Sequence, residues 1–276
     1  MNQFFMYYYN FMPSIILDKD SYYLINYHNL YYRLYKVDDI SFVMDQFLIS
    51  RNYSFFYSFV ENKYQDIFSY YQKVYYVLLK VNDSVFNRLY LLPYHGNMIS
   101  LDWKKKWIQK SEFIQSYYFY FKGKYNIIDE SIDYFLSLLE LSIFYIGDYD
   151  SYFYPPYISH STFSIEEYFN PLDIKIDVAE RDFGEYLKYL FFHDLIDKSK
   201  IRQLLYENRN VYRYSLVLAR VLYPNYYFDL LDLIFMEKKD SSILDDVLGR
   251  VLEFKEYFLF LEDEISKYIE IKKVLL

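Results

Sequence analysis

The sequence predicts an α+β protein of two lobes, a small β-rich lobe over residues 1–81 and a larger, mainly helical lobe over residues 82–276. Two observations carry this prediction. Short runs rich in β-branched and aromatic residues fill the first third of the chain, and turn-like pieces separate them. After residue 83 the apolar residues recur at helical spacing instead. A chain of 276 residues is long enough for one large domain or two lobes.

Five segments of the small lobe have the composition of strands. They are SIILD, SYYLINYH, LYYRLYKV, SFFYSFVEN and KVYYVLLKV, at residues 14–18, 21–28, 30–37, 54–62 and 73–81. One helix, predicted over residues 38–52, interrupts them. We expect Asp39 to cap its start and Phe42, Val43, Phe47 and Leu48 to share its buried face. The predicted order is therefore β-β-β-α-β-β.

The larger lobe opens with a predicted helix over residues 103–119. A strongly amphipathic helix follows over residues 129–147, with Gly147 as its C-cap. Its expected apolar face contains Ile132, Phe135, Leu136, Leu139 and Ile143. The segment DIKIDV, at residues 173–178, reads as a short strand. Helices then continue from Asp182 to the C-terminus, with Pro171 and Pro224 as local breakers.

The composition excludes several classes of protein. Tyr (39) and Phe (26) are abundant and Gly (5) is scarce; because the tyrosines are spread evenly, codon bias explains them better than a surface for stacking or cross-linking. A net charge of −8 argues against general binding of nucleic acid or anionic membranes. The absence of Cys excludes disulfides and thiolate metal sites. With no signal-peptide pattern and no apolar run of about 18 residues, we expect no membrane span and a cytoplasmic or peripherally attached protein.

A small β-rich lobe with one inserted helix, followed by a helical lobe, is the layout of the protein-kinase-like fold. Four segments carry a more specific resemblance: YVLLKV (76–81), LPYHGNMISLDWKKKWIQKSEF (92–113), ISHSTF with DIKIDVAERDFGEYLK (158–163 and 173–188), and ARVLYPNYYFDLL (219–231). Together they resemble the aminoglycoside phosphotransferase branch of this superfamily. Within that branch they are most similar to spore coat-associated proteins of the CotS and YutH type.

The resemblance implies a site for ATP and magnesium, and the residues of this chain can be compared with those that such a site needs. Phosphate-binding loops normally need glycine, but residues 1–95 contain none. Lys36 and Arg33 are the candidate cations for the phosphates. Because they lie three positions apart on a strand they face opposite sides, so only one of them can point into the cleft. Asp45 is the one acid inside the predicted helix that could serve as the usual partner.

The catalytic-loop region contains His160 and Thr162. The resemblance places the catalytic Asp of the phosphotransferases at Thr162, and a threonine hydroxyl cannot accept a proton near neutral pH. Glu166 and Glu167 follow and could substitute, although a role in the next turn fits them better. Asn170 is the only Asn near the expected position of a metal-binding Asn.

Asp177 ends the strand IKID as a magnesium-binding Asp does, and a structural turn acid is the equal alternative. The string RDFG at residues 181–184 matches the metal-binding signature of protein kinases, but it lies at a predicted helix start. Asp182 as N-cap and Glu185 three residues later form a capping box, so we interpret Arg181 and Asp182 as structural.

Three functions remain open. The first is a kinase-fold protein that lacks key catalytic residues and binds protein partners, with spore coat components implied by the resemblance and spore coat association as its location. The second is an active small-molecule phosphotransferase that uses ATP and magnesium. The third is a nucleotide-binding pseudokinase without turnover.

Overall fold

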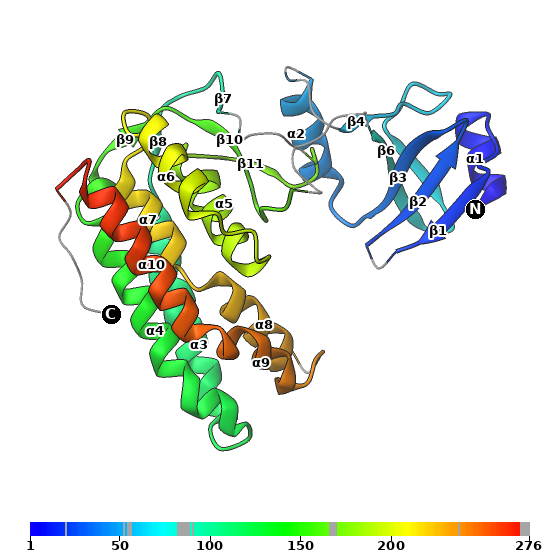
Figure 1. Cartoon of the computed structure of the whole chain (residues 1–276). Coiled ribbons are helices and arrows are strands. Elements are labelled where there is room, and N and C mark those ends of the chain that lie inside the picture. Colours follow the sequence, from blue (N-terminus) through cyan, green and yellow to red (C-terminus); the bar gives the residue numbers. More distant parts are fainter. Residues whose placement is uncertain are drawn as a thin grey trace. The chain divides into compact units, whose positions relative to one another are not determined.

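The computed structural model describes residues 1–19, 21–51, 53, 57–81, 89, 91–165, 170–236 and 238–270 (Figure 1). The chain forms two compact units. Unit 1 contains residues 1–88 and 160–175, and unit 2 contains residues 89–159 and 176–276. The segment that carries His160 and Thr162 is thus grouped with the N-terminal residues, and Asp177 is grouped with the helices.

Unit 1 is built on an antiparallel sheet with the order β1-β2-β3-β6-β4, in which β5 also pairs with β6. Its elements are α1 (Asn2–Tyr9), β1 (Ile15–Asp18), β2 (Tyr22–Tyr27), β3 (Leu30–Val37), α2 (Ile40–Ser50), β4 (Tyr57–Phe59), β5 (Phe68–Tyr71) and β6 (Val74–Val81). Two tight turns have both central residues at positive φ: His28 and Asn29 join β2 to β3, and Gln72 and Lys73 join β5 to β6. This conformation matches the twist of a two-residue hairpin.

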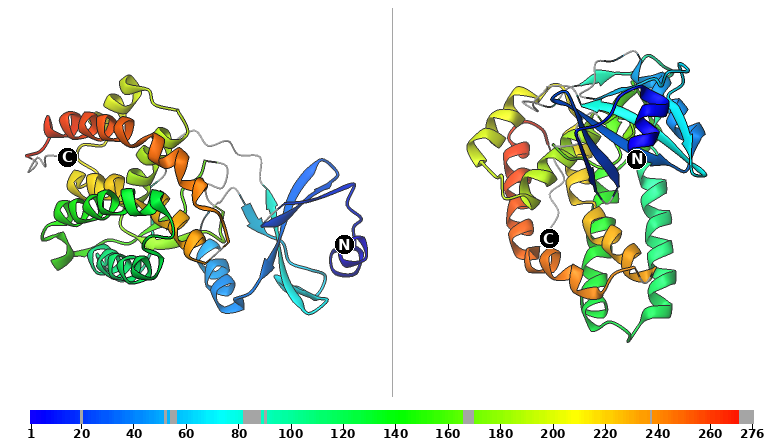
Figure 2. Two further views of the ribbon diagram at one scale, coloured as in Figure 1. Left: turned by 90° about the horizontal axis from the view of Figure 1, so that it is seen from below. Right: turned by 90° about the vertical axis from the view of Figure 1, so that its right-hand side faces the viewer.

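A different helix packs on each face of this sheet. Helix α1 lies beside the sheet (Figure 2), and its Phe4 and Phe5 belong to one hydrophobic cluster with Ile25, Leu34 and Leu78. On the other face Val43 of α2 belongs to a second cluster. That cluster also contains Val37, Tyr57, Ile67, Val77 and Leu79.

The structure confirms four of the predicted strands and the inserted helix, and within the fifth predicted segment it describes β4. It adds α1 and β5, which the sequence analysis did not predict. Asp39 caps α2 as expected, because its carboxylate accepts a hydrogen bond from the Phe42 backbone N–H at 2.9 Å. The predicted apolar face of α2 is partly wrong: Phe42 and Leu48 are exposed, and Gln46 is buried beside Val43 instead. The sequence pattern does not define the buried face of α2, because apolar residues lie around most of the circumference of this helix.

Unit 2 is mainly helical. Its helices are α3 (Trp103–Phe121), α4 (Asn126–Ile146), α5 (Glu180–Phe192), α6 (Lys198–Glu207), α7 (Tyr214–Leu222), α8 (Asn225–Phe235), α9 (Asp245–Gly249) and α10 (Val251–Ser266), with 3₁₀ turns at Tyr149–Ser151 and Ser241–Leu244. The chain also contains short strands outside the large sheet, of which β7 (Leu92–Pro93), β10 (Tyr157–His160) and β11 (Ile174–Asp177) have the order β11-β10-β7. Strands β8 (Ile99–Ser100) and β9 (Phe153–Tyr154) pair with each other.

The helices of unit 2 pack around one large hydrophobic core. The long helices α3 and α4 lie side by side (Figure 1), and α7 packs against both α4 and α5. All side chains of α7 from Leu216 to Leu222 are buried, which places this helix at the centre. None of the helices described is long and apolar enough to cross a membrane.

Two details of unit 2 correct the sequence analysis. Helix α5 begins at Glu180 after Ala179, so Asp182 lies buried in the first turn and is not the N-cap. On α4 the buried face contains Ile132, Phe135 and Leu139 as predicted, whereas Leu136 and Ile143 are only partly buried. Gly147 ends α4 at a φ of 54°, as the predicted C-cap requires.

Candidate functional site

The two candidate cations of β3 lie on opposite faces of the sheet, as strand geometry requires. Lys36 shares the face of Leu34, towards α1, and its exposed ammonium lies 5.7 Å from the centre of the Tyr23 ring. Arg33 shares the face of Tyr57, and its guanidinium lies 4.6 Å and 4.9 Å from the rings of Tyr22 and Tyr57. Of the two, only Arg33 is on the face that α2 covers.

The inserted helix does not present an acid to that face. Asp45 is exposed on α2, and the polar side chain that α2 buries against the sheet is Gln46, which is 5 % exposed. Among the residues of unit 1 that the structure describes, no ion pair joins Asp45 to a cation of the sheet. Arg33 instead lies among aromatic rings, where cation–π attraction stabilises the guanidinium.

The segment that contains His160 and Thr162 is organised by backbone hydrogen bonds. His160 is 1 % exposed at the end of β10, and its ring lies edge-on to Phe163. The Ser161 N–H donates to the Asp173 carbonyl at 2.8 Å, and the Thr162 N–H donates to the Asp173 carboxylate at 3.1 Å. Asp173 thus fixes the backbone of the loop at Thr162, the position at which the resemblance implies a catalytic Asp. Glu166 and Glu167 lie outside the described residues.

The side chain of Asn170 also makes hydrogen bonds within unit 1. Its amide NH₂ donates to the Tyr35 hydroxyl of β3 at 3.2 Å, and its carbonyl oxygen accepts from the Leu172 N–H at 3.0 Å. Asn170 is buried, and Leu172 packs against the cluster on the α2 face. These contacts attach the 160–175 segment to the sheet of unit 1.

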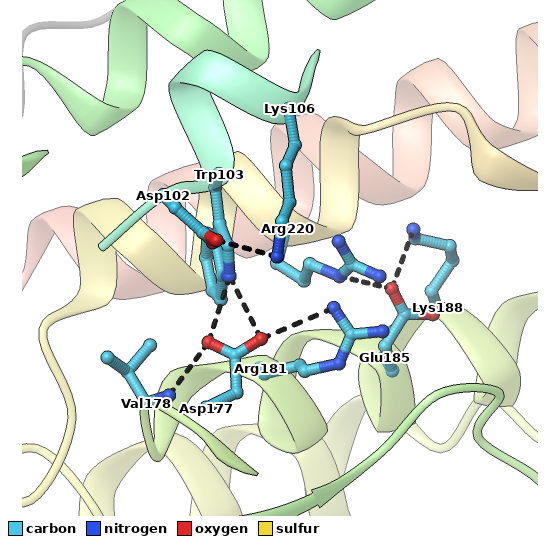
Figure 3. A network of polar contacts seen from close by, with 9 residues as sticks. All are labelled: Asp102, Trp103, Lys106, Asp177, Val178, Arg181, Glu185, Lys188 and Arg220. Carbon is cyan, nitrogen blue, oxygen red and sulfur yellow. Dashed lines mark hydrogen bonds and ion pairs between the residues drawn. The ribbon is translucent and has the colours of Figure 1, made fainter. Parts of the chain in front are cut away.

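In unit 2, Asp177 is bound on both carboxylate oxygens (Figure 3). The indole N–H of Trp103 donates to Oδ1 at 3.0 Å and to Oδ2 at 3.2 Å. The Val178 N–H donates to Oδ1 at 2.8 Å, and the guanidinium of Arg181 lies 3.6 Å from Oδ2. The single indole hydrogen is shared between the two oxygens, and the guanidinium at 3.6 Å is an ion-pair partner beyond hydrogen-bond distance. Two N–H donors and one cation of unit 2 therefore face this carboxylate.

The network continues along the same face of α5 (Figure 3). Glu185 forms ion pairs with Arg220 of α7 at 2.5 Å and with Lys188 at 3.3 Å. Lys188 also donates to the Tyr223 carbonyl at 2.8 Å and to the Asn225 side chain at 2.5 Å. Because Tyr223 and Asn225 lie at the junction of α7 and α8, this lysine joins α5 to both helices.

Burial and neighbouring charges shift the pKa values of these groups. Burial alone would raise the pKa of Glu185, but the cations of Arg220, Lys188 and Arg181 outweigh it and lower the pKa to about 2. Burial lowers the pKa of Lys188 to about 8, against the opposing effect of Glu185. Burial and the neighbouring Arg220 lower the pKa of Arg181 to about 10, so this guanidinium stays charged at neutral pH.

Sequence reasoning placed Asp177 correctly at a strand end but did not identify its partners. Trp103 lies 74 residues away along the chain, so no local pattern links it to Asp177. The spacing of Asp177, Arg181, Glu185 and Lys188, at intervals of four, four and three, does indicate one face of a helix. That charged stripe was the available signal for a buried network, whereas the sequence analysis assigned Glu185 to a capping box with Asp182.

Magnesium binding by Asp177 stays a prediction. A divalent cation there would compete with the N–H groups of Trp103 and Val178 for the carboxylate oxygens, and it would lie beside the guanidinium of Arg181. Within the described ranges, no group of three or more His, Cys, Asp or Glu side chains is placed to hold a metal ion.

Comparison of the sequence with protein-family models and with curated proteins finds no match. The fold, in contrast, is similar to solved structures. An aminoglycoside phosphotransferase from Alicyclobacillus acidocaldarius superposes with a TM-score of 0.63 at 9% identity, covering 93% of this chain and 92% of that one. A spectinomycin phosphotransferase bound to AMP gives a TM-score of 0.58 at 8% identity, covering 99% and 98%.

A third structure, a thermostable mutant of an aminoglycoside phosphotransferase in its apo form, gives a TM-score of 0.52 at 9% identity and covers 98% of this chain and 100% of that one. The chain therefore has the protein-kinase-like fold of aminoglycoside phosphotransferases, which confirms the predicted fold class. At identities this low the likeness establishes the fold and leaves the activity open.

Proposed function

We propose that this chain is a kinase-fold protein without phosphoryl-transfer activity, which acts by binding protein partners. The observation that supports this most directly is the state of Asp177. The carboxylate that the resemblance assigns to magnesium accepts hydrogen bonds from an indole N–H and a backbone N–H and forms an ion pair with a guanidinium of its own unit. In the fold family, phosphoryl transfer depends on a metal ion that bridges the phosphates.

Two further features of the chain support the proposal. Thr162 stands where the resemblance implies the Asp that accepts the proton of the substrate hydroxyl, and its backbone is bound by Asp173. Residues 1–95 contain no glycine, so a closely approaching phosphate loop would have to be built from residues with side chains. As the setting we propose the spore coat, with its components as partners. This part rests on the resemblance of the quoted segments to CotS and YutH proteins.

The role of Asp177 can be tested with Asp177→Asn. If the carboxylate is structural, the variant loses stability without any ligand, by about 1.5–3 kcal/mol for hydrogen bonds to a charged group. Asp133→Asn, which changes an exposed acid on α4, is the matched control and should change the stability little. The loss of stability measures the contacts of Asp177 in the ligand-free protein, and the comparison with magnesium and ATP tests whether the same carboxylate also binds a metal.

The same proteins should be heated with and without magnesium and ATP. Ligand present at a hundred times its Kd would stabilise the native state by about 2.7 kcal/mol, which is readily measured. We expect no magnesium-dependent rise at millimolar ATP and no transfer of phosphate to aminoglycosides. A rise that Asp177→Asn abolishes would instead support a nucleotide site, and turnover would then decide between a pseudokinase and an enzyme. In a spore-forming host, a fluorescent fusion would test the proposed location.

A second candidate function is an ATP-dependent small-molecule phosphotransferase. It is favoured by one specific observation, the likeness of the backbone to phosphotransferases over 92–100% of their chains. This candidate requires Asp177 to exchange Trp103 and Arg181 for a cation. It therefore predicts that Trp103→Phe strengthens the response to magnesium and ATP, whereas the non-catalytic proposal predicts no response from either protein.

A further inference from the structure

Two exposed tyrosines of unit 1 lie against each other on either side of a lysine. Tyr7 of α1 is 55% exposed and Tyr64 is 58% exposed, and their ring centres are 6.2 Å apart. The ammonium of Lys63 lies 4.3 Å from the centre of the Tyr7 ring and 5.0 Å from that of Tyr64. The rings are thus in contact distance while their edges remain open to solvent.

The backbone on both sides of this pair is firmly held. Phe4 and Phe5 are 0% exposed and anchor α1 to the sheet. The loop of residues 62–66 is organised by buried Asn62, whose side-chain oxygen accepts from the N–H groups of Tyr64 and Asp66.

The amide of Asn62 also donates to the Phe68 carbonyl at 2.7 Å. The Lys63 N–H then donates to the Tyr8 carbonyl at 2.8 Å, which ties the loop to α1. The two rings therefore meet because of the fold and not by chance collision.

The two phenols of the pair differ in acidity. The interaction between the two hydroxyls raises the pKa of Tyr7 and lowers the pKa of Tyr64, and the neighbouring Lys63 also lowers the pKa of Tyr64. A phenolate gives up an electron more readily than a phenol does. Tyr64 is therefore the group of this pair from which an oxidant would first remove an electron, and Tyr7 is the neighbour in reach of the resulting radical.

We propose that Tyr7 and Tyr64 are an oxidative modification site that forms an intrachain dityrosine cross-link when a haem peroxidase and hydrogen peroxide are present. Each phenol loses one electron and its hydroxyl proton. The two phenoxyl radicals form one carbon–carbon bond between the ring carbons adjacent to the oxygen-bearing carbons, and the hydrogens on those carbons move to the oxygens. Hydrogen peroxide takes up two electrons and two protons and leaves as two water molecules. This inference does not depend on the proposed function.

The chain contains two comparisons that make the proposal specific. Tyr70 and Tyr75 are an exposed cross-strand pair whose ring centres are closer, at 4.7 Å. Tyr120 is more exposed, at 82%, and its ring neighbour is Phe119. If proximity or exposure alone governed coupling, these residues would react first. The proposal requires the Tyr7–Tyr64 link to form ahead of both.

The experiment treats the full chain, at low concentration, with peroxidase and limiting hydrogen peroxide and then digests it with trypsin. Cleavage after Lys19, Lys63, Lys73 and Lys80 places Tyr7 in residues 1–19, Tyr64 in 64–73 and Tyr75 in 74–80. Mass spectrometry should find 1–19 joined to 64–73 with the loss of two hydrogens, in protein that still runs as a monomer. Tyr7→Phe and Tyr64→Phe should each lose this product, and Tyr120→Phe should keep it.

Lys63→Gln tests the contribution of the cation, with dityrosine fluorescence as the readout, and we expect slower coupling. A product that joins 64–73 to 74–80, or one that links two chains, as the main species would overturn the proposal. So would the same yield of the 1–19 to 64–73 product in Tyr7→Phe or Tyr64→Phe. Because each of these substitutions removes only an exposed hydroxyl, the variants should fold, and circular dichroism would verify this.

Discussion

At the scale of single residues, the buried charges of unit 2 depend on a close approach between α5 and α7. Gly184 makes this approach possible. A Cβ added at this glycine would lie 2.6 Å from Cβ and 2.9 Å from Cγ of Arg220, and 3.2 Å from the carbonyl oxygen of Val217. The glycine of the RDFG string is therefore explained by helix packing, which also brings Arg220 within reach of Glu185.

We expect Gly184→Ala to destabilise unit 2 by about 1–3 kcal/mol, the usual effect of overpacking. Gly249→Ala is the matched control, since a Cβ there would meet nothing within 4 Å. This control should be neutral or slightly stabilising, because alanine restricts the unfolded chain. Urea unfolding followed by tryptophan emission measures both, since Trp103 and Trp107 are the only tryptophans and both lie in unit 2. Equal effects of the two substitutions would contradict the explanation.

Glu185 should make the stability of unit 2 sensitive to acid. Its folded pKa of about 2 is below the ordinary value of 4.5, so its contribution is complete above pH 4.5 and is lost as the pH falls towards 2. The shift corresponds to about 3 kcal/mol. The gap in unfolding free energy between wild type and Glu185→Gln should narrow by about this amount between pH 5 and pH 2. Glu112→Gln, which changes an exposed acid of α3, is the matched control.

At the scale of elements, the pattern of the sequence was informative where one face of a strand or helix is buried. Segment 30–37 alternates between the α1 face and the α2 face, and β3 has the predicted ends. Segment 2–9 gave no such signal, because all seven residues of α1 after Asn2 are aromatic, Met or Gln and its buried stripe of Phe4 and Phe5 is short. Helix α1 is specified by tertiary contacts with the sheet, which a local pattern cannot reveal.

The start of α2 is one element boundary that a local signal did specify. Asp39 accepts from the Phe42 N–H, so Asp39→Ala should destabilise unit 1 by about 1 kcal/mol. Asp38→Ala, one residue earlier and also exposed, removes the same charge without the cap and serves as the control. Hydrogen exchange of the amides of α2 measures the effect locally. If both substitutions loosen α2 equally, charge rather than capping is responsible.

At the scale of the whole molecule, the sequence predicted the two-lobed kinase-like layout but only parts of the site. The interpretation of Thr162 and of the missing glycines depends on residue type and order alone and stays a prediction. The contacts of Asp177 could not be predicted, because they depend on Trp103, which is distant along the chain. Likewise, Lys36 and Arg33 were equivalent candidates until the structure showed that Lys36 shares the α1 face and Arg33 the α2 face. Contacts between distant segments decide these cases.

Each unit has a hydrophobic core of its own, and this leads to a prediction for the whole chain. Leu78 and Leu216 are both 0% exposed, the first in the sheet of unit 1 and the second in α7 of unit 2. Truncating either to Ala should cost about 2–5 kcal/mol, from lost burial and the cavity left behind. Because both tryptophans lie in unit 2, Leu216→Ala should lower the unfolding midpoint seen by tryptophan emission. Leu78→Ala should act mainly on hydrogen exchange of β3 and β6. If Leu78→Ala shifts the tryptophan transition as far as Leu216→Ala does, the two cores unfold as one cooperative block.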